Sequence, residues 1–265
     1  MKTIGFIGAG NMAYAMLAGA RANMKQVELV YTDINKKRLE FVKEATGIDY
    51  ITTNAACYRL ADIIVLSIKP QYYKAVLEEL GTMSLDNKIL ITIAPGISIK
   101  WIKEIVDQPV RVVRAMPNTP ALVGEGMSCV CYESSDYSSE EIQIIEGLFN
   151  SFGKMVKLTE NQLDMVVPVS GSSPAYVYIM IEAMADAGVL FGLSRDTAYT
   201  LAAQSVYGAA KMVLETGQHP AVLKDAVCSP GGTTIEAVRT LEEKGFRSAI
   251  IEAMQACYDK TLEFK

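Results

Sequence analysis

The feature that most constrains the fold of this chain lies near its N-terminus. A β-forming run, Thr3–Ile7, leads into the segment GAGNMA at 8–13, and an apolar helical pattern follows over Tyr14–Ala22. This is a GxGxxG pattern between a strand and a helix, with alanine as the third small residue. Such a loop is either a tight structural turn or a pyrophosphate-binding loop. In the second case the backbone approaches the pyrophosphate closely, and the free amides at the start of the helix bind it. Because it sits inside a strand-loop-helix-strand unit, we predict a dinucleotide-binding domain of the Rossmann type.

Short β-forming runs alternate with helical patterns up to about residue 157. The runs are Lys2–Ile7, Val27–Tyr31, Ile63–Ser67, Lys88–Ile93 and Val110–Ala115. This alternation is typical of an α/β fold in which helices cover a doubly wound parallel sheet. We assign residues 1–160 to this domain.

No further β-forming run follows Leu158. Helical patterns instead occupy Ala175–Phe191, Arg195–Thr216, Thr233–Lys244 and Arg247–Phe264, with glycine- and proline-containing segments between them. The sequence therefore predicts a second, all-helical domain over residues 161–265.

One helical segment of this second domain, Met180–Leu190, is apolar over more than one face. Only Glu182 and Asp186 interrupt it, so we expect the helix to be buried. A helical domain this small and this apolar can complete its core across a dimer interface. We therefore predict a homo-oligomer.

The composition narrows the classes of partner. The formal net charge is -5, and the 25 Lys and Arg are spread along the chain, so we expect no nucleic-acid partner. No stretch reaches the roughly 18–20 uninterrupted apolar residues of a membrane span, and the first residues lack a signal-peptide pattern. Five cysteines without a CxxC pair and a single histidine indicate reduced thiols, no metal site and a cytoplasmic location.

An acidic residue stands where the adenosine ribose of a dinucleotide binds. Asp33 lies 23 residues beyond Gly10, at the end of the second predicted strand, and its carboxylate can accept hydrogen bonds from the ribose hydroxyls. That favours NADH, because a carboxylate repels the 2′-phosphate of NADPH. Lys36, Lys37 and Arg38 follow at once and either offer compensating charge or form a solvated helical turn. The sequence leaves the choice between NADH and NADPH open.

Three further loops follow predicted strands at the same edge of the sheet. They are SIKP at 67–70, APG at 94–96 and MPNTP at 116–120. Ligands of open α/β sheets bind at the carboxyl ends of the strands, so we expect these loops to line the nicotinamide side. Taken alone, Lys69 is typical of a solvated surface lysine, and the prolines are typical of a rigid connection.

Two segments of the helical half are unusual: VSGSSPAY at 169–176 and DAVCSPGGTTI at 225–235. Each opens a helix with glycine and small hydroxyl-bearing residues. Free amides, the helix dipole and the hydroxyls of Thr233 and Thr234 suit a small carboxylate. Helix capping alone is the alternative interpretation.

Together these motifs resemble the pyrroline-5-carboxylate reductase family, whose members reduce 1-pyrroline-5-carboxylate to L-proline in the last step of proline biosynthesis. The resemblance spans the whole chain, and its most specific part is SPGGTT at 229–234 with the following IEAV. SGSSPAY, SIKP and NTP support it. The resemblance implies a Rossmann domain that binds NADH or NADPH, a helical dimerisation domain, and a homo-oligomer, which is a dimer and in many members a decamer.

The resemblance also implies roles for single residues. With Asp33 added from the argument above, the expected cofactor-binding residues are Gly8, Ala9, Gly10, Asn11, Met12, Ala13, Asp33, Asn54, Ser67, Ile68, Lys69, Pro70, Ala94 and Gly96. The expected substrate-binding residues are Ser170, Ser172, Gly232, Thr233 and Thr234. Two positions depart from the family pattern: Ala226 replaces an asparagine that contacts the cofactor in some members, and Gly217 replaces an acidic residue.

Reduction of a cyclic imine suits the side chains that are present. A carbonyl reductase usually positions His, Lys or Tyr as a general acid, but no lysine occurs between Leu158 and Ala210, and the single His219 precedes a proline in an expected loop. A protonated pyrroline is already an electrophile, so positioning is the main requirement. We predict that the Thr234 hydroxyl, hydrogen-bonded to the imine nitrogen, is the most important catalytic group.

Two alternatives compete with this interpretation. A 3-hydroxyacid dehydrogenase-like enzyme shares the two-domain plan but needs a lysine on the first long helix of the second domain, where none occurs. A non-catalytic NAD(P) sensor has no need of the SPGGTT segment.

Overall fold

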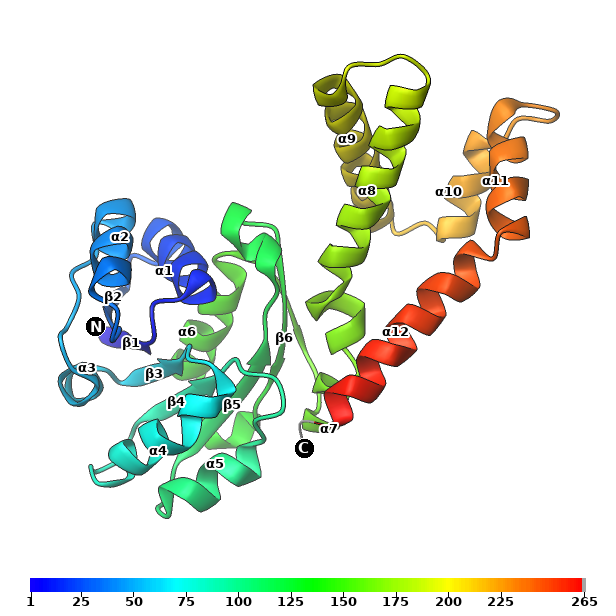
Figure 1. Cartoon of the computed structure of the whole chain (residues 1–265). Helices are drawn as coiled ribbons and strands as arrows, with labels where there is room; N and C mark the ends of the chain where they lie inside the picture. Colours follow the sequence, from blue (N-terminus) through cyan, green and yellow to red (C-terminus); the bar gives the residue numbers. More distant parts are fainter. Residues whose placement is uncertain (264–265) are drawn as a thin grey trace. The chain divides into compact units, whose positions relative to one another are not determined.

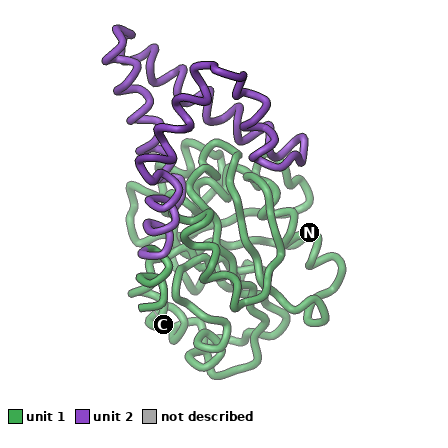
Figure 2. The backbone as a smooth tube through the Cα atoms, turned by 90° about the vertical axis from the view of Figure 1, so that its right-hand side faces the viewer, with its two compact units in different colours: residues 1–172, 257–265 green, residues 173–256 purple. Residues whose placement is uncertain are grey.

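A computed structural model describes residues 1–263, which form two compact units (Figure 2). The first unit comprises Met1–Ser172 together with the chain end from Cys257, and the second comprises Ser173–Ala256. The segment 161–172, which the sequence assigns to the helical domain, belongs to the first unit. The reason is packing, since Asp164 of this segment forms a buried ion pair with Arg114 of the sheet.

The first unit contains a seven-stranded sheet (Figure 1). Its strands are β1 (Lys2–Ile7), β2 (Val27–Thr32), β3 (Ile63–Leu66), β4 (Ile89–Thr92), β5 (Arg111–Met116), β6 (Gly126–Cys131) and β7 (Gly153–Lys157), in the order β2-β1-β3-β4-β5-β6-β7. The five predicted strands are confirmed, with small shifts of their ends. All neighbouring strands pair in parallel except β5 and β6, which are antiparallel. The predicted doubly wound parallel sheet is therefore confirmed as a mostly parallel one.

Helices cover both faces of this sheet. They are α1 (Asn11–Asn23), α2 (Lys36–Thr46), α3 (Asn54–Leu60), α4 (Tyr73–Gly81), α5 (Ile99–Val106), α6 (Ser139–Asn150) and α7 (Glu160–Leu163), with short helical turns η1 (Pro70–Tyr72), η2 (Thr119–Val123), η3 (Ser134–Asp136) and η4 (Val167–Gly171). Alternate strand residues pack on opposite faces: Ile63 and Val65 join α1, α2 and α6, whereas Ile64 and Leu66 join α4 and α5. This two-sided core confirms the doubly wound fold.

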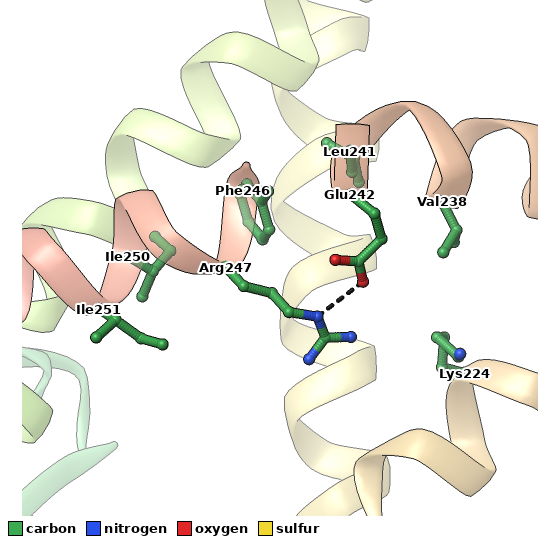
Figure 3. Close-up of a pocket in the computed structure, with 8 residues that line it drawn as sticks. All are labelled: Lys224, Val238, Leu241, Glu242, Phe246, Arg247, Ile250 and Ile251. Atoms are coloured by element: carbon green, nitrogen blue, oxygen red, sulfur yellow. Dashed lines mark hydrogen bonds and ion pairs between the residues drawn. The ribbon is translucent and has the colours of Figure 1, made fainter. Parts of the chain in front are cut away.

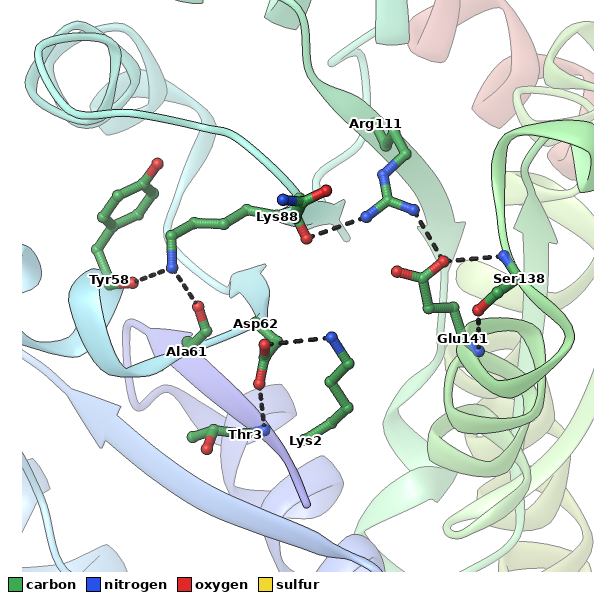
Figure 4. Close-up of polar contacts among 10 residues, drawn as sticks. Lys2, Thr3, Tyr58, Ala61, Asp62, Lys88, Arg111, Ser138 and Glu141 are labelled. Atoms are coloured by element: carbon green, nitrogen blue, oxygen red, sulfur yellow. Dashed lines mark hydrogen bonds and ion pairs between the residues drawn. The ribbon is translucent and has the colours of Figure 1, made fainter.

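Polar contacts tie together the strands at the amino ends of the sheet (Figure 4). The Asp62 carboxylate accepts a hydrogen bond from the Thr3 amide at 2.9 Å, and the Lys88 ammonium donates to the carbonyl of Ala61 at 2.6 Å. Arg111 pairs with Glu141 at 2.8 Å. These contacts fix the amino ends of the parallel strands. Ligands of open α/β sheets bind at the opposite end, where the strands have their carboxyl ends.

The second unit is helical. It contains α8 (Ser173–Leu190), α9 (Arg195–Thr216), α10 (Pro220–Val227), α11 (Thr233–Glu243) and most of α12 (Phe246–Leu262). The four predicted helices are confirmed, although the predicted end of the last one at Phe264 lies outside the described residues. The sequence missed α10, a short helix that starts with Pro220 and is capped by His219. Among residues 1–263, no helix is both long enough and apolar enough to cross a membrane.

The predicted burial of Met180–Leu190 is not found in the single chain. Within α8 only Ala185 is buried. Met184 and Leu190 of the predicted segment are 42% and 82% exposed, and Ile179, just before it, is 66% exposed. A further apolar hollow of about 480 Å³ lies among α10, α11 and α12, where Phe246, Ile250 and Ile251 line it beside the ion pair of Arg247 with Glu242 (Figure 3). The second unit therefore lacks a closed core of its own, because its large apolar side chains are left exposed in the single chain.

Candidate cofactor and substrate site

The glycine loop forms the centre of the site in the first unit. Gly8 adopts a φ of +95°, and a Cβ atom there would collide with the carbonyl oxygen of Ser67. Gly10 has a different surrounding, since no atom lies within 4 Å of the place where its Cβ would be. Ala13 is completely buried against the sheet. The first small residue is thus required by the chain itself, whereas the second keeps space open for a ligand.

The amino end of α1 opens toward this space. Gly10 is the N-cap residue and has no side chain with which to accept hydrogen bonds from the first-turn amides. The Gly10 carbonyl accepts the first helical bond, from the Tyr14 amide at 2.9 Å. The amides earlier in this first turn, including those of Asn11 and Met12, are positioned to bind an anion such as a phosphate group.

A cavity of about 410 Å³ adjoins the amino end of α1. The loops predicted from the strand ends meet here, and the lining residues are Gly10, Asn11, Met12, Ser67, Ile68, Lys69, Pro70, Ile93, Ala94, Pro95, Met116, Pro117, Val167, Gly171 and Ser172. The structure thus brings together the loops after β1, β3, β4 and β5. Gly96 is not among the lining residues and forms a turn with a φ of +75° just beyond them.

A second, smaller cavity of about 180 Å³ borders the glycine loop at Gly8. Its lining includes Gly8, Asp33 and Asn54, as expected from the sequence, and also Ile34 and Tyr72, which sequence reasoning missed. Both of these apolar side chains are exposed. Their position directly after β2 and after the SIKP segment is the signal that would have found them.

The Asp33 carboxylate is held against the glycine loop. One oxygen accepts a hydrogen bond from the Ala9 amide at 2.6 Å, and the other accepts from the Asn35 amide at 2.8 Å. Each carboxylate oxygen keeps a further lone pair for a ribose hydroxyl. Arg38 also contacts the loop, because its Nε donates to the Ala9 carbonyl at 2.7 Å while its guanidinium lies 4.7 Å from the centre of the Phe41 ring. Ala9 itself is buried and contributes through its backbone.

The two serines of the SGSS segment lie in different surroundings. Ser172 lines the larger cavity, and its hydroxyl accepts a hydrogen bond from the Cys257 thiol at 3.3 Å. The Ser170 hydroxyl instead donates to the Val166 carbonyl at 3.3 Å. Ser170 also forms a side-chain hydrogen bond with Cys129. Burial raises the pKa of the Cys129 thiol, and the hydrogen bond with Ser170 offsets part of that rise. Only Ser172 of the pair faces the cavity.

The remaining predicted substrate residues lie in the second unit, at the start of α11. Gly231 adopts a φ of +67°, and Gly232 is the N-cap residue, so that Thr233 and Thr234 form the first turn. Because Gly232 has no side chain, capping by a side chain does not account for the segment. The first-turn amides and two hydroxyls thus gather at one helix end, as a small carboxylate requires.

His219 has a structural role in the same unit. Its Nδ1 accepts a hydrogen bond from the Ala221 amide at 3.2 Å, which caps α10. Within residues 1–263, no three His, Cys, Asp or Glu side chains group as metal ligands would.

Comparison with known proteins decides between the candidate families. Residues 160–264 match the family described as pyrroline-5-carboxylate reductase dimerisation, and residues 3–96 match the NADP oxidoreductase family, coenzyme F420-dependent. The pyrroline-5-carboxylate reductase of Escherichia coli (strain K12) is 44% identical over 263 residues, which cover 98% of this chain and 97% of that protein. The chain belongs to the pyrroline-5-carboxylate reductase family. The enzyme of Glycine max is 41% identical over 98% of this chain and 95% of that protein.

Solved structures of the family have the same fold. A pyrroline-5-carboxylate reductase from Coxiella burnetii superposes with a TM-score of 0.90 at 33% identity and covers 99% of this chain and 98% of that one. The Plasmodium falciparum pyrroline carboxylate reductase, solved with NADP bound, gives a TM-score of 0.87 at 34% identity with the same coverage. Family membership makes this chain an NAD(P)H-dependent oxidoreductase of proline biosynthesis that acts on a CH–NH group, and gives it a dimerisation domain.

Proposed function

We propose that the first unit of this chain holds NADH or NADPH while the start of α11 holds 1-pyrroline-5-carboxylate, which is reduced to L-proline. The observation that carries the proposal is the cavity in which four strand-end loops and Ser172 meet beside the glycine loop. In the second unit, the start of α11 gathers small polar residues without a side-chain cap, and these support the substrate-binding part of the proposal.

The residues present fit a dinucleotide. The space over Gly10 accepts a pyrophosphate, because no protein atom occupies it, and the first turn of α1 offers amides to the phosphates. The smaller cavity, with Asp33 and Asn54, suits the adenosine end. When bound, the reduced nicotinamide supplies the hydride for the C=N carbon. The loops at 67–70 and 94–95 then exclude water from the reacting atoms and orient the substrate.

The substrate is anchored by its carboxylate. The amides of Thr233 and Thr234 hold that carboxylate at the helix end, and the Thr234 hydroxyl bonds the imine nitrogen. Gly232, whose own amide donates to the Ser229 carbonyl at 3.0 Å, lies beside the carboxylate without a side chain to block it. Ser172 contributes a hydroxyl that already accepts a hydrogen from Cys257, which leaves its own hydrogen free to donate. A protonated imine gains a hydride and becomes a neutral amine, so no strong general acid is required of the chain.

Asp33 favours NADH as the cofactor. Its carboxylate is fixed by two backbone amides at the ribose end of the site, where a 2′-phosphate would be repelled. Arg38 donates to the Ala9 carbonyl through its Nε, and its terminal nitrogens offset only part of this repulsion. NADPH is therefore the poorer of two usable cofactors in this proposal.

The exposed apolar faces of the second unit support assembly as a homo-oligomer. Helix α8 leaves Ile179 and Leu190 without cover in the single chain, and a second copy is the partner that the matched dimerisation family indicates. We propose a dimer in the cytoplasm, with dimers joining into a decamer as the family resemblance implies, and no nucleic-acid or membrane partner.

Turnover of the purified chain tests this function. Oxidation of NADH and of NADPH is followed at the nicotinamide absorbance on addition of 1-pyrroline-5-carboxylate, with L-proline measured as the product. The proposal expects turnover with both cofactors and a higher kcat/KM with NADH. Cofactor binding without turnover would refute the reductase and favour a dinucleotide sensor.

A further inference from the structure

The turn η4, at the rim of the larger cavity, departs from regular helix geometry. The Val167 carbonyl accepts a hydrogen bond from the Ser172 amide, five residues later, at 2.8 Å. This wider turn brings Gly171 and Ser172 into the cavity lining. Turns of this type are frequent at functional sites because they redirect a few residues out of a helical path.

The backbone of this turn has a carbonyl that a regular helix would leave without a donor. In an α-helix the Ser170 carbonyl accepts from the amide four residues later. That residue is Pro174, which has no N–H. Asn118 provides the missing donor, since its Nδ2 donates to the Ser170 carbonyl at 2.9 Å. The bond joins the loop after β5 to the turn beside the cavity.

The Asn118 amide is itself fixed in orientation. Its Oδ1 accepts a hydrogen bond from the Met127 amide at 2.8 Å, at the start of β6, and the residue is only 8% exposed. With its oxygen committed to Met127, the amide group has one orientation, and its nitrogen must face Ser170. Asn118 therefore ties the backbone of the turn to the sheet, in addition to the side-chain contact of Ser170 with Cys129 of β6.

We propose that Asn118 is a positioning residue for the reduction: by holding the Ser170 carbonyl, it fixes the turn that presents Gly171 and Ser172 to the reacting atoms. This inference rests on the proposed function, because the cavity must be where cofactor and substrate meet. Asn118 touches neither of them. Its loss impairs the reaction through the misplacement of Ser172, while the glycine loop and its dinucleotide contacts are unaffected.

The variant Asn118→Asp separates positioning from folding. It keeps the oxygen that accepts from Met127 but replaces the donor to Ser170 with a second oxygen. We expect kcat at pH 8 to fall by about tenfold or more, with the Kd for NADH, from fluorescence titration, within about twofold of the parent. The matched control is Asn23→Asp, since the Asn23 Nδ2 likewise donates to a backbone carbonyl, that of Ser151, at 2.8 Å. The control loses thermal stability and keeps its kcat.

A pH profile gives a readout that a purely structural role would not change. A protonated aspartic acid can donate to the Ser170 carbonyl, and burial raises the pKa of such a carboxyl group above its usual value of about 3.9. The ratio of the Asn118→Asp kcat to the parental kcat should therefore rise at least about threefold between pH 8 and pH 5.5. The corresponding ratio for Asn23→Asp should stay flat.

A second variant, Asn118→Ser, removes both hydrogen bonds without adding charge, and should lose kcat to a similar extent with no recovery at low pH. The positioning role would be overturned if Asn118→Asp kept the parental kcat. It would also be overturned if the ratio of its kcat to the parental kcat did not change between pH 8 and pH 5.5. Failure of both variants to fold would also overturn it, because Asn118 would then be a requirement of the fold. A parent chain without turnover refutes the proposed function instead, so the two failures are distinguishable.

Discussion

The two units of this chain hide their apolar side chains to very different degrees. In the first unit the strands β3 and β4 are buried along their whole length, and large residues such as Phe6, Tyr31 and Phe149 are completely covered. In the second unit the buried residues are three alanines, Ala185, Ala198 and Ala202. Burial of large apolar groups is the main stabilising contribution to a fold. The first unit is thus a complete domain, whereas the second leaves its large apolar side chains uncovered in the single chain.

The largest effect is expected from a charge on the uncovered face of α8. Ile179→Arg would place an unpaired cation in a dimer interface, at a cost of about 3–5 kcal/mol. We expect a monomeric chain whose turnover falls by about 100-fold or more, while NADH binding stays within about threefold of the parent. Sedimentation velocity and turnover measure the two effects.

A matched substitution in the first unit sharpens this contrast. Leu60 of α3 is 56% exposed, close to the exposure of Ile179, but the domain that carries it is complete. Leu60→Arg should leave assembly and turnover unchanged. Equal behaviour of the two arginine variants would contradict the proposed difference between the units.

Within the first unit, two glycines should respond differently to alanine. Gly8→Ala introduces a clash at a positive φ and should lower the free energy of unfolding by about 2–4 kcal/mol. Gly10→Ala places a methyl group in open space, so stability should change little while dinucleotide affinity falls about tenfold or more. Thermal unfolding and NADH titration measure the pair, and equal destabilisation by both would refute this assignment.

The substrate half of the site is tested by Thr234→Ala in the second unit. Loss of a hydrogen bond to the imine nitrogen should lower kcat/KM by about 1–3 kcal/mol, while NADH affinity stays at the parental value. Thr240→Ala, on the same helix but outside the SPGGTT segment, serves as the control. An unchanged kcat/KM for Thr234→Ala would refute the proposed hydrogen bond of the Thr234 hydroxyl to the imine nitrogen.

Cofactor choice should change through Asp33. In Asp33→Ser the repulsion of a 2′-phosphate is lost, and we expect the NADPH to NADH ratio of kcat/KM to rise about tenfold, which corresponds to about 1.4 kcal/mol. The ratio is measured from the oxidation of NADH and of NADPH on addition of 1-pyrroline-5-carboxylate. A constant ratio would show that Asp33 does not govern the choice.

The smallest effect is a pH-dependent one at the far edge of the sheet. Arg111 lowers the pKa of Glu141 through their hydrogen bond. A lowered pKa in the folded state stabilises the fold above the unfolded pKa of about 4.3 and loses that contribution as pH falls through the folded value. Glu141→Gln should therefore cost about 0.5–1 kcal/mol at pH 7 and progressively less below pH 4.3. Urea unfolding at several pH values measures the difference, and a cost that is independent of pH would contradict the assignment.

How far the sequence predicts the fold depends on how local each signal is. The strands β1 to β5 are predictable because each is a run of β-branched and apolar residues that ends at a loop signal. β6 and β7 are not, because Gly126, Ser128 and Lys154 interrupt their apolar pattern. Helix α8 is predictable from its length and apolar content, but its exposure in the single chain is not, because burial depends on distant contacts that no local pattern specifies.

The same reasoning applies to the site. The glycine loop and the strand-end loops follow from short motifs in a strand-loop-helix context, and the structure brings them to one cavity. The bond of Asn118 to Ser170 is beyond such reasoning, because it spans 52 residues and ends on a backbone carbonyl. The hydrogen bond of the Ser170 hydroxyl to the Val166 carbonyl, in place of a position facing the cavity, is likewise indicated by no motif.

The most direct test of the account is the mass of the parent chain in solution at the concentration used for turnover. The difference between the units predicts that sedimentation equilibrium finds a dimer or a larger multiple of the 28.9 kDa chain, because a second copy covers the apolar faces of the second unit. A 28.9 kDa monomer that turns over 1-pyrroline-5-carboxylate at the full rate would contradict it.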